Sequence, residues 1–423
     1  MPTSPLPELA WRELISQHTE GLPELLGRES VSAYCGFDPT APSLHVGSLV
    51  PIMGLVHLQR SGHRPIALVG GGTGLIGDPS GKASERPLAD SEAVAANAEK
   101  LRTQLERFLD FSGRAGARMR DNADWLTKLR AVDFMRDVGK HFTINYMMAK
   151  ESVKARLEEG ISYTEFSYML LQAYDYLELY RREGATLQIG GSDQWGNITA
   201  GMELIRRSDG GDAHALTLPL VTTASGVKFG KTEAGAVWLD ASLTSPYKFY
   251  QFWINADDQD VGRYQRFFTL LSREEIEAWD EEVLHQPERR ESQRVLAKEV
   301  TTIVHGAEAA RMCEEMSGLL FGGADAKKLS KAALVALANE IPFVQMARPA
   351  DGSLDVLELF VAARLVPSKG AGRRLLEQGG LYVNGSRLAA EDRAILLDSL
   401  LEGGHLLLRK GAREYCLISV LQG

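Results

Sequence analysis

The chain has 423 residues, of which 44% are hydrophobic and 24% charged, and its formal net charge is −9. This length suits two or three domains, and the acidic balance excludes a global basic field, so any RNA or phosphate site must be a local patch. Three cysteines stand far apart without a CxxC pair, which supports neither a disulfide framework nor a protein-bound metal. Residues 1–27 lack a signal-peptide pattern and no apolar run reaches the roughly 18 residues of a membrane span, so we expect a cytoplasmic protein.

The first strand is expected over 30–37, after a helical segment over 6–26. A turn-rich segment then leads to the tetrapeptide HVGS at 45–48, after which an apolar pattern at helical spacing begins. Strand, loop and helix start in this order favour an anion, because unpaired N–H groups and the helix dipole point the same way. We expect Ser48 to be the N-cap and Gly47 to let a ligand approach the backbone. A plain buried helix start is the alternative.

A second buried strand, 64–69, ends in a glycine-rich run. Its residues 72–77 match the GxGxxG pattern formally, but a dinucleotide site needs that run to open a helix. Here the sequence DPSG at 78–81 follows, which is turn chemistry. The P-loop pattern fails as well, at Ala83, where Ser or Thr is required. The glycines are therefore expected to give a ligand access to the backbone, with Asp78 facing it.

The elements that follow alternate between helix and strand. They are expected as a helix over 94–109, a strand over 117–120, helical patterns to 182, a strand over 185–189, a helix over 195–206 and a strand over 216–221. This order predicts an α/β fold with a mostly parallel, Rossmann-like sheet and ligands at the carboxyl ends of the strands.

Two cationic loops accompany these strands. Lys82 and Arg86 lie on a small-residue loop, and the sequence KFGKT at 228–232 carries Lys228 and Lys231 around a glycine. Most such side chains sit on solvated surface loops. A pair of mobile cations would equally suit a polyphosphate leaving group.

Polar residues also recur at helical spacing in the segment that follows. Tyr168, Gln172 and Asp175 are four and three residues apart, which puts them on one helix face. Buried polar groups need partners, so a polar ligand is one reading, and an amphipathic helix with a wet face is the other. In the loop 190–195, Asp193 could be an N-cap or could accept ribose hydroxyl groups.

Four ranges organise the chain. We expect a Rossmann-like domain over 1–240, a helical domain over 241–341, a linker over 342–352, where two prolines and an Asp-Gly pair occur, and an α+β module over 353–423. Within that module, residues 364–374 carry four cations and no acid, which favours contact with an RNA backbone. A solvated face is the alternative.

Six motifs together carry a family resemblance. They are YCGFDPT (34–40), HVGS (45–48), GGGTGLIGDPSGK (70–82), YMLLQAYD (168–175), GGSDQW (190–195) and KFGKT (228–232). In this order they resemble the class I aminoacyl-tRNA synthetases, and specifically the bacterial tyrosyl-tRNA synthetases, over nearly the whole catalytic part, and the resemblance continues to the C-terminus. HVGS looks like the HIGH signature and KFGKT like the KMSKS signature. The chain departs from these signatures at Ser48, where the name has His, and at Thr232.

The resemblance implies a two-step reaction. Tyrosine and ATP, with Mg²⁺ carried by the nucleotide, give tyrosyl-adenylate and pyrophosphate, and tyrosine is then transferred to the 3′-terminal ribose of tRNA(Tyr). It assigns phosphate contacts to Thr40, His45, Lys82, Arg86, Lys228 and Lys231; tyrosine binding to Tyr34, Asp78, Tyr168, Gln172 and Asp175; and the ATP and adenylate region to Cys35, Gly36, Asp38, Gly47, Ser48, Gly191, Asp193, Gln194, Lys231 and Thr232. Tyr34 and Asp175 would hydrogen-bond the substrate phenol.

The rest of the chain follows from the same resemblance. Residues 125–165 would be the connective insertion that helps form a homodimer, and the helical domain would approach the anticodon. The C-terminal module would bind RNA through Arg364, Lys369, Arg373 and Arg374. Three alternatives remain open: a tryptophanyl-type synthetase, a non-catalytic RNA-binding relative, and a nucleotidyltransferase of the same superfamily.

Overall fold

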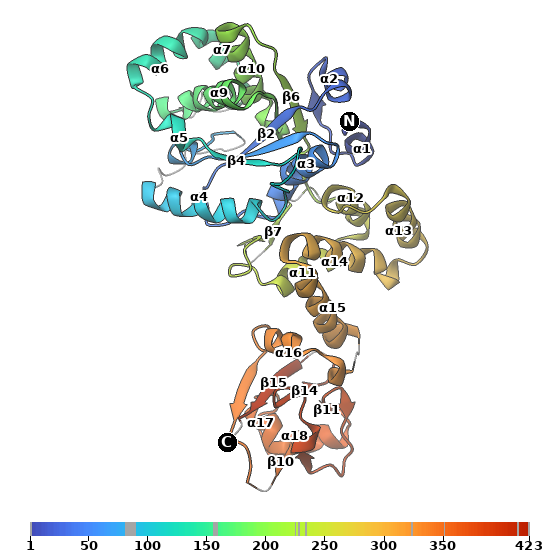
Figure 1. Cartoon of the computed structure of the whole chain (residues 1–423). Helices are drawn as coiled ribbons and strands as arrows, with labels where there is room; N and C mark the ends of the chain where they lie inside the picture. The colour runs from blue at the N-terminus through green and yellow to red at the C-terminus, as the bar shows by residue number, and fades with distance from the viewer. Residues whose placement is uncertain are drawn as a thin grey trace. The chain divides into compact units, whose positions relative to one another are not determined.

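The computed structural model describes residues 2–80, 90–154, 160–224, 226, 229–232, 235–322, 325–350, 352–412 and 414–421. The chain forms two compact units (Figure 1). One comprises Met1–Ser245 with Phe252–Val304, and the other Pro246–Gln251 with His305–Gly423. The helical range 241–341, expected as one domain, is therefore divided between the two units.

A six-stranded sheet forms the centre of the first unit. Its strands, in spatial order, are β1 (Gln17–His18), β6 (His214–Leu218), β5 (Ala185–Gly191), β2 (Ser32–Phe37), β3 (Arg64–Val69) and β4 (Arg118–Asp121). All neighbours are parallel except β1, which is antiparallel to β6. The chain runs outward from β2 through β3 to β4, and β5 and β6 lie on the other side of β2. The strand order thus reverses between β2 and β5, and ligands of such sheets bind outside the carboxyl ends at this reversal.

Helices cover both faces of this sheet. The helices α9 (Tyr163–Glu183) and α10 (Trp195–Asp209) pack against each other on one face, and α3 (Leu49–Arg60) and α4 (Ser91–Leu105) lie on the other (Figure 1). Helix α9 begins where the Ser162 side chain accepts the Glu165 N–H, and it ends at Gly184, whose φ of 62° suits a glycine. The α/β architecture predicted from the sequence is confirmed.

In the described part of the segment between β4 and α9, the chain forms four short helices. They are α5 (Ala123–Leu126), α6 (Ala131–Asp137), α7 (Ile144–Met148) and α8 (Glu151–Lys154). This insertion leaves several large apolar side chains in solvent, with exposed fractions of 76% for Val132, 58% for Met135 and 63% for Ile144. Apolar exposure on this scale is typical of a surface that another protein covers.

The first unit also contains α1 (Leu6–Trp11), α2 (Leu22–Arg28), α12 (Asp258–Phe268), α13 (Arg273–His285) and most of α14 (Glu291–His305). Helix α12 packs against α3. The guanidinium of Arg12, just after α1, is buried and donates to the carbonyl oxygens of Arg266, Thr269 and Leu271 at the end of α12. These contacts join the end of α12 to the segment that follows α1.

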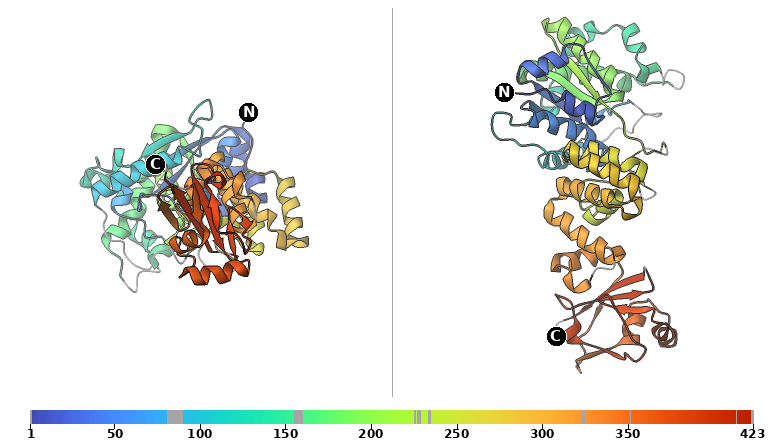
Figure 2. Two further views of the ribbon diagram at one scale, coloured as in Figure 1. Left: turned by 90° about the horizontal axis from the view of Figure 1, so that it is seen from below. Right: turned by 90° about the vertical axis from the view of Figure 1, so that its right-hand side faces the viewer.

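The second unit contains part of α11 (Pro246–Ile254), with α15 (Ala307–Gly322), α16 (Lys331–Leu337), α17 (Val356–Ala362), α18 (Lys369–Glu377) and two sheets. The five-stranded sheet has the order β12 (Ser386–Arg387), β11 (Leu381–Val383), β14 (His405–Lys410), β15 (Glu414–Val420) and β9 (Phe343–Met346), and its strands lie side by side in Figure 2 (red and orange). A separate pair is formed by β10 (Ser353–Asp355) and β13 (Ala394–Leu396).

The prediction of a linker over 342–352 is wrong for the first half of that range. Strand β9 lies inside that range and pairs in parallel with β15. Val344 and Met346 pack against the core of the C-terminal sheet. The prolines on either side of this short apolar alternation favoured a linker in the sequence analysis.

No described helix is long and apolar enough to cross a membrane.

Candidate functional site

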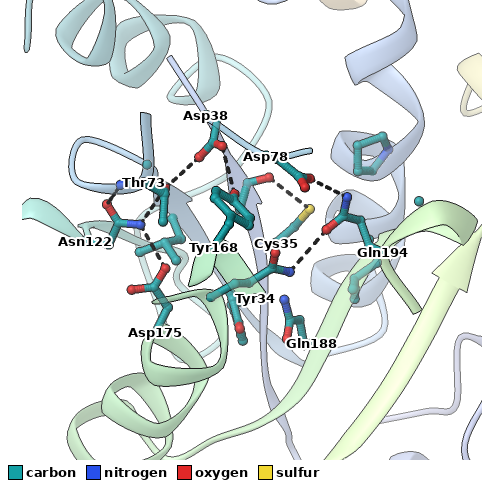
Figure 3. Close-up of a pocket in the computed structure, with 18 of the residues that line it drawn as sticks. Tyr34, Cys35, Asp38, Thr73, Asp78, Asn122, Tyr168, Asp175, Gln188 and Gln194 are labelled. Carbon is teal, nitrogen blue, oxygen red and sulfur yellow. Dashed lines mark hydrogen bonds between the residues drawn. The ribbon is translucent and has the colours of Figure 1, made fainter. Parts of the chain in front are cut away.

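A cavity of about 230 Å³ lies where β2 and β5 end (Figure 3). Side chains from β2, the glycine-rich run, the turn after β4, helix α9 and the loop after β5 line it. Eleven residues that the sequence analysis assigned to tyrosine, ATP or phosphate are among the lining residues: Tyr34, Cys35, Gly36, Asp38, Thr40, Asp78, Tyr168, Gln172, Asp175, Gly191 and Gln194. The fold thus brings together residues up to 160 positions apart in the sequence (194 − 34).

Asp175 lies at one end of this cavity, on α9, and only 2% of it is exposed. Its two carboxylate oxygens accept hydrogen bonds from Asn122 Nδ2 at 2.8 Å and Trp125 Nε1 at 2.7 Å. Burial raises the pKa of Asp175 to about 8, against the opposing effect of these two donors. The carboxyl group can therefore accept or donate a hydrogen bond near neutral pH.

Tyr34 projects from β2 into the same end of the cavity, and its hydroxyl is buried without a hydrogen-bond partner among the described residues. The ring is held edge-on against Tyr176, with centroids 5.1 Å apart. Gln188, the register partner of Tyr34 on β5, also has a buried amide oxygen without a partner in the described part of the chain. Buried polar atoms are nearly always hydrogen-bonded, so these two indicate that a polar ligand completes the site.

A chain of hydrogen bonds runs from Asp175 to the centre of the cavity. Asn122 Nδ2 also donates to Thr73 Oγ1 at 2.9 Å, and Thr73 donates to Asp38 Oδ1 at 2.7 Å. The Tyr168 hydroxyl donates to the other oxygen of Asp38 at 2.9 Å, as Figure 3 shows. A side chain at Gly70 would collide with Asp38, which explains one glycine of the run.

A second network lies across the cavity from the first. Gln194 Nε2 donates to Asp78 Oδ2 at 2.7 Å, and Gln172 Nε2 donates to Gln194 Oε1 at 3.2 Å. Asn197 in turn donates to Gln172 Oε1 at 3.0 Å. The two networks place the carboxylates of Asp38 and Asp78 on one small cavity, an arrangement that favours a cationic group such as an ammonium. Burial, followed by the charge of Asp38, raises the pKa of Tyr168 well above its usual value, so its hydroxyl stays a donor.

The turn before α3 differs from the prediction in one respect. Ser48 has helical backbone angles and its side chain makes no cap hydrogen bond, so the prediction of Ser48 as N-cap is wrong. His45 caps instead, because a short 3₁₀ turn over Val46–Ser48 precedes the helix, and His45 Nδ1 accepts the Gly47 N–H at 3.0 Å. The cavity lining, as far as the chain is described, does not extend to His45, Gly47, Ser48 or Asp193.

The cationic loops are only partly described. Lys82, Arg86 and Lys228 lie outside the described residues, as do the side chains of Lys231 and Thr232. The backbone of Lys231–Thr232 forms β7, which pairs with β8 (Gly235–Ala236). The hairpin is attached to the HVGS turn, since Val46 N donates to Val237 O at 3.0 Å and Leu239 N to Leu44 O at 2.8 Å.

The residues predicted to bind RNA belong to the second unit. Arg364, Lys369, Arg373 and Arg374 are all exposed. Lys369 pairs with Glu358 at 2.6 Å, whereas Arg373 and Arg374 lie on α18. A cation already paired with a carboxylate on the same surface is a weaker candidate for a phosphate contact.

Four residues that line or support the cavity through polar side-chain atoms had no role in the sequence analysis. Thr73, Asn122, Trp125 and Gln188 provide the hydrogen bonds and unsatisfied atoms described above. Their positions in the chain could have identified two of them. Asn122 follows the carboxyl end of β4 and Gln188 lies near the end of β5, and ligands bind at these ends. Within the described residues, no group of three or more His, Cys, Asp or Glu could hold a metal ion.

Comparisons with known proteins extend over both units. Residues 27–322 match the family model of "tRNA synthetases class I (W and Y)", and residues 334–418 match that of the "Tyrosine--tRNA ligase SYY-like C-terminal domain". The tyrosine–tRNA ligase of Bacillus caldotenax is 53% identical over 418 residues, which are 98% of this chain and 99% of that protein. That of Roseiflexus castenholzii is 52% identical over 425 residues, 99% and 100% of the two chains. The crystal structure of a C-terminally truncated mitochondrial tyrosyl-tRNA synthetase of Aspergillus nidulans superposes with a TM-score of 0.68 at 31% identity, covering 75% of this chain and 94% of that one.

Proposed function

The chain belongs to the tyrosine–tRNA ligases of the class I tRNA synthetase family, and we propose that the cavity between β2 and β5 is the place where its tyrosine meets ATP. Membership of this family excludes the tryptophanyl, non-catalytic and nucleotidyltransferase alternatives left open by the sequence. Enzymes of this class use ATP, and the proposal for this chain is that ATP enters with Mg²⁺ bound to its phosphates, since Mg²⁺ commonly binds through substrate phosphates.

The proposed reaction needs no protein nucleophile. A tyrosine carboxylate oxygen attacks the α-phosphorus of ATP, the bond to the β-phosphate bridging oxygen breaks, and pyrophosphate leaves. A hydroxyl of the 3′-terminal ribose of tRNA then attacks the carbonyl carbon of tyrosyl-adenylate, and AMP leaves. Catalysis then consists of holding the reactants in line and stabilising the charge that develops on the leaving group.

The observation that carries the assignment is the unpaired hydroxyl of Tyr34 in a cavity that also contains Asp175. A substrate phenol could accept the Tyr34 O–H, which is otherwise unpaired, and donate a further hydrogen bond to Asp175, whose two oxygens already accept one each. Phenylalanine would leave both without that partner. Rejection of phenylalanine by tyrosyl-tRNA synthetases is itself the general example of this rule.

The ammonium group of tyrosine is assigned to the carboxylate-rich part of the cavity. Asp78 has one oxygen bonded to Gln194, and Tyr168 and Gln172 flank the same space. The carboxylates of Asp78 and Asp38 would balance the positive charge. With the phenol held at Asp175, the substrate carboxylate would point toward the open side of the cavity, where the nucleotide must bind.

The remaining assignments concern the nucleotide. Cys35, Gly36, Asp38, Gly191, Asp193 and Gln194 are proposed to surround the ribose and adenylate, and Thr40, His45, Gly47 and Ser48 the phosphates. Lys82, Arg86, Lys228, Lys231 and Thr232 are proposed to close over the pyrophosphate. The hydrogen bonds between the HVGS turn and the hairpin of Lys231 support this grouping, because they bring the two signatures to the same edge of the sheet.

Three further proposals concern the whole chain. The exposed apolar side chains of the insertion support a homodimer through that surface. The exposed arginines of the C-terminal module support contact with the tRNA backbone. The proposed location is the cytoplasm, where tRNA is charged for translation.

Pyrophosphate exchange with single amino acids tests the assignment of the cavity. We expect ATP–pyrophosphate exchange with tyrosine, and exchange with phenylalanine or tryptophan at least about 10³-fold weaker at equal concentration, since the buried Tyr34 hydroxyl would remain unpaired and Asp175 would receive no hydrogen bond from the ligand. The exchange should also fall about 10²-fold in Lys231→Ala, if this cation stabilises the leaving group, and should be unchanged in Lys331→Ala, an exposed lysine of the second unit. Exchange that persists in Lys231→Ala would contradict the proposed clamp.

A further inference from the structure

The cationic signature KFGKT contains one apolar residue, Phe229, and its side chain is buried. Phe229 is only 6% exposed, although it stands between two lysine positions of a loop. Its ring stacks on Phe268 with centroids 5.3 Å apart and planes 10° apart, and it packs at 5.0 Å from Tyr264. Phe252 and Trp253, at the end of α11, complete the pocket at 5.5 Å and 5.8 Å.

Gly230, the residue after Phe229, lies against the HVGS signature. Gly230 has a φ of 76°, and a Cβ placed there would lie 2.6 Å from Val46 Cγ2 and 3.8 Å from Gly47 N. The chain therefore passes directly over the HVGS turn. Val237 N donates to Gly230 O at 3.1 Å, and Val46 N donates to Val237 O at 3.0 Å, so the hairpin and the turn are joined on both sides of this contact.

The same helix supports the two signatures in different ways. Helix α12 packs against α3, the helix that the HVGS turn opens, and it supplies Tyr264 and Phe268 to the pocket of Phe229. A shift of α12 would therefore move the cationic hairpin and the HVGS turn together. A cationic loop that acts on a ligand needs a fixed point close to its lysines, and a stacked aromatic ring provides one that carries no charge.

We propose that Phe229 is a positioning residue, through which the aromatic pocket of α11 and α12 fixes the cationic hairpin against the HVGS turn. This inference rests on the proposed role of Lys231 at the leaving pyrophosphate. Phe229 touches no substrate group. It acts by keeping the root of the hairpin, two residues before Lys231, in register with His45. Loss of the ring leaves the tyrosine end of the cavity intact and loosens only the phosphate side.

Phe229→Ala tests this role in the full-length enzyme. We expect the rate of adenylate formation at saturating tyrosine and ATP to fall on the order of tenfold to a hundredfold, because a misplacement of about 1 Å can lower a rate 10²-fold. The Kd of tyrosine, measured without ATP, should change less than about twofold, and Phe229→Leu should recover only part of the rate. An unchanged rate, or an equal loss of tyrosine binding, overturns the proposal.

Phe267→Leu is the matched control. Phe267 lies next to Phe268 on α12, is fully buried, and contacts Phe268 and Arg263 instead of the Phe229 ring. This variant should lower the thermal midpoint, as any such core truncation does, and leave the rate of adenylate formation unchanged. A fall equal to that of Phe229→Ala would mean that the helices merely need to be folded, and the proposal would be wrong.

A double-mutant cycle keeps the test open if Phe229→Ala fails to fold. The rate effects of Phe229→Leu and Phe268→Leu should be non-additive, because the two rings stack, whereas those of Phe229→Leu and Phe267→Leu should add. Additivity in both cycles overturns the anchor. Lys231→Ala separates this failure from that of the proposed function. If Lys231→Ala leaves the rate intact, the clamp is wrong, and if it lowers the rate while Phe229→Ala does not, only the anchor is wrong.

Discussion

At the scale of single residues, the hydroxyl of Tyr34 offers a test of binding that is separate from stability. The group is buried without a partner in the described chain, so the ligand-free protein carries a desolvation penalty for it. Tyr34→Phe should leave the thermal midpoint unchanged or raise it slightly. The same substitution should weaken tyrosine binding by roughly 2- to 10-fold, the effect of one neutral hydrogen bond, and should leave phenylalanine binding unchanged or stronger.

Thermal unfolding with and without tyrosine measures both effects of Tyr34→Phe. Tyr176→Phe is the control, since its hydroxyl donates to His214 O at 2.7 Å and its loss should lower stability instead. If Tyr34→Phe destabilises the free protein as much as Tyr176→Phe does, the Tyr34 hydroxyl has a partner in solution and the argument fails.

Asp175 gives a prediction about pH. Burial raises its pKa to about 8 in the folded protein, whereas an unfolded aspartate titrates near 3.9. Between these values the folded state holds the proton that the unfolded state has lost, so the contribution of Asp175 to stability falls as pH rises toward 8 and is constant above it. The slope is at most about 1.4 kcal/mol per pH unit.

Unfolding midpoints at pH 5, 6, 7 and 8 test this for wild type and Asp175→Asn. The asparagine does not titrate, so the stability of wild type relative to the variant should decrease steadily over this range. Parallel pH profiles for the two proteins would show that Asp175 is already ionised at pH 5. That result would also make its carboxylate available to the substrate phenol throughout.

Which residues line the cavity was predictable where a motif carried them. Tyr34, Asp78, Gln172 and Asp175 were identified from the sequence, and all line one cavity. Asn122 and Trp125 were not, because their contribution is a hydrogen bond to Asp175 from a different strand end. Such a contact depends on how strands lie side by side, and no local pattern records it. His45 takes the capping role predicted for Ser48, because a 3₁₀ turn over Val46–Ser48 precedes α3, a shift of three residues that composition does not reveal.

At the scale of elements, the hairpin of β7 and β8 depends on a glycine for two separable reasons. Gly230 has a positive φ of 76°, and a side chain there would also collide with Val46, 2.6 Å from its Cβ position. Gly230→Ala combines both penalties, so we expect the rate of adenylate formation to fall about tenfold or more while tyrosine affinity is kept. Single-turnover kinetics separate the two quantities.

Gly226→Ala is the natural control for Gly230→Ala. Gly226 has nearly the same φ, 79°, but no atom of the described chain beyond its two neighbours lies within 4 Å of its Cβ position. Its alanine variant should therefore show the backbone penalty alone, with a rate close to wild type. Equal effects of the two variants would mean that backbone strain, and not the approach of the hairpin to the HVGS turn, explains the loss.

The elements of the parallel sheet were well predicted, since a continuous apolar run such as 65–69 favours a buried strand. Strand β9 was not. Its four residues lie between prolines, and only pairing with β15, more than seventy positions later, makes them a strand (417 − 343 = 74). Short strands of this kind are specified by the sheet that they join.

At the scale of the whole molecule, the position of β9 decides where the chain can be cut. Deleting residues 342–423 removes the five-stranded sheet entirely, whereas deleting 353–423 leaves β9 without β15 and with Phe343, already 39% exposed, beside unpaired backbone groups. An unpaired apolar strand favours pairing with other chains. Both deletions remove Tyr415, which donates to Leu320 O, so that loss is common to the two.

We expect both truncated chains to keep tyrosine-dependent pyrophosphate exchange within about threefold and to lose most tRNA charging, but only the longer one to aggregate. Size-exclusion chromatography with light scattering, run beside both assays, measures these outcomes. Equal solubility would show that β9 does not act as an exposed edge, and a parallel loss of exchange and charging would show that the C-terminal module serves the first step as well as the second.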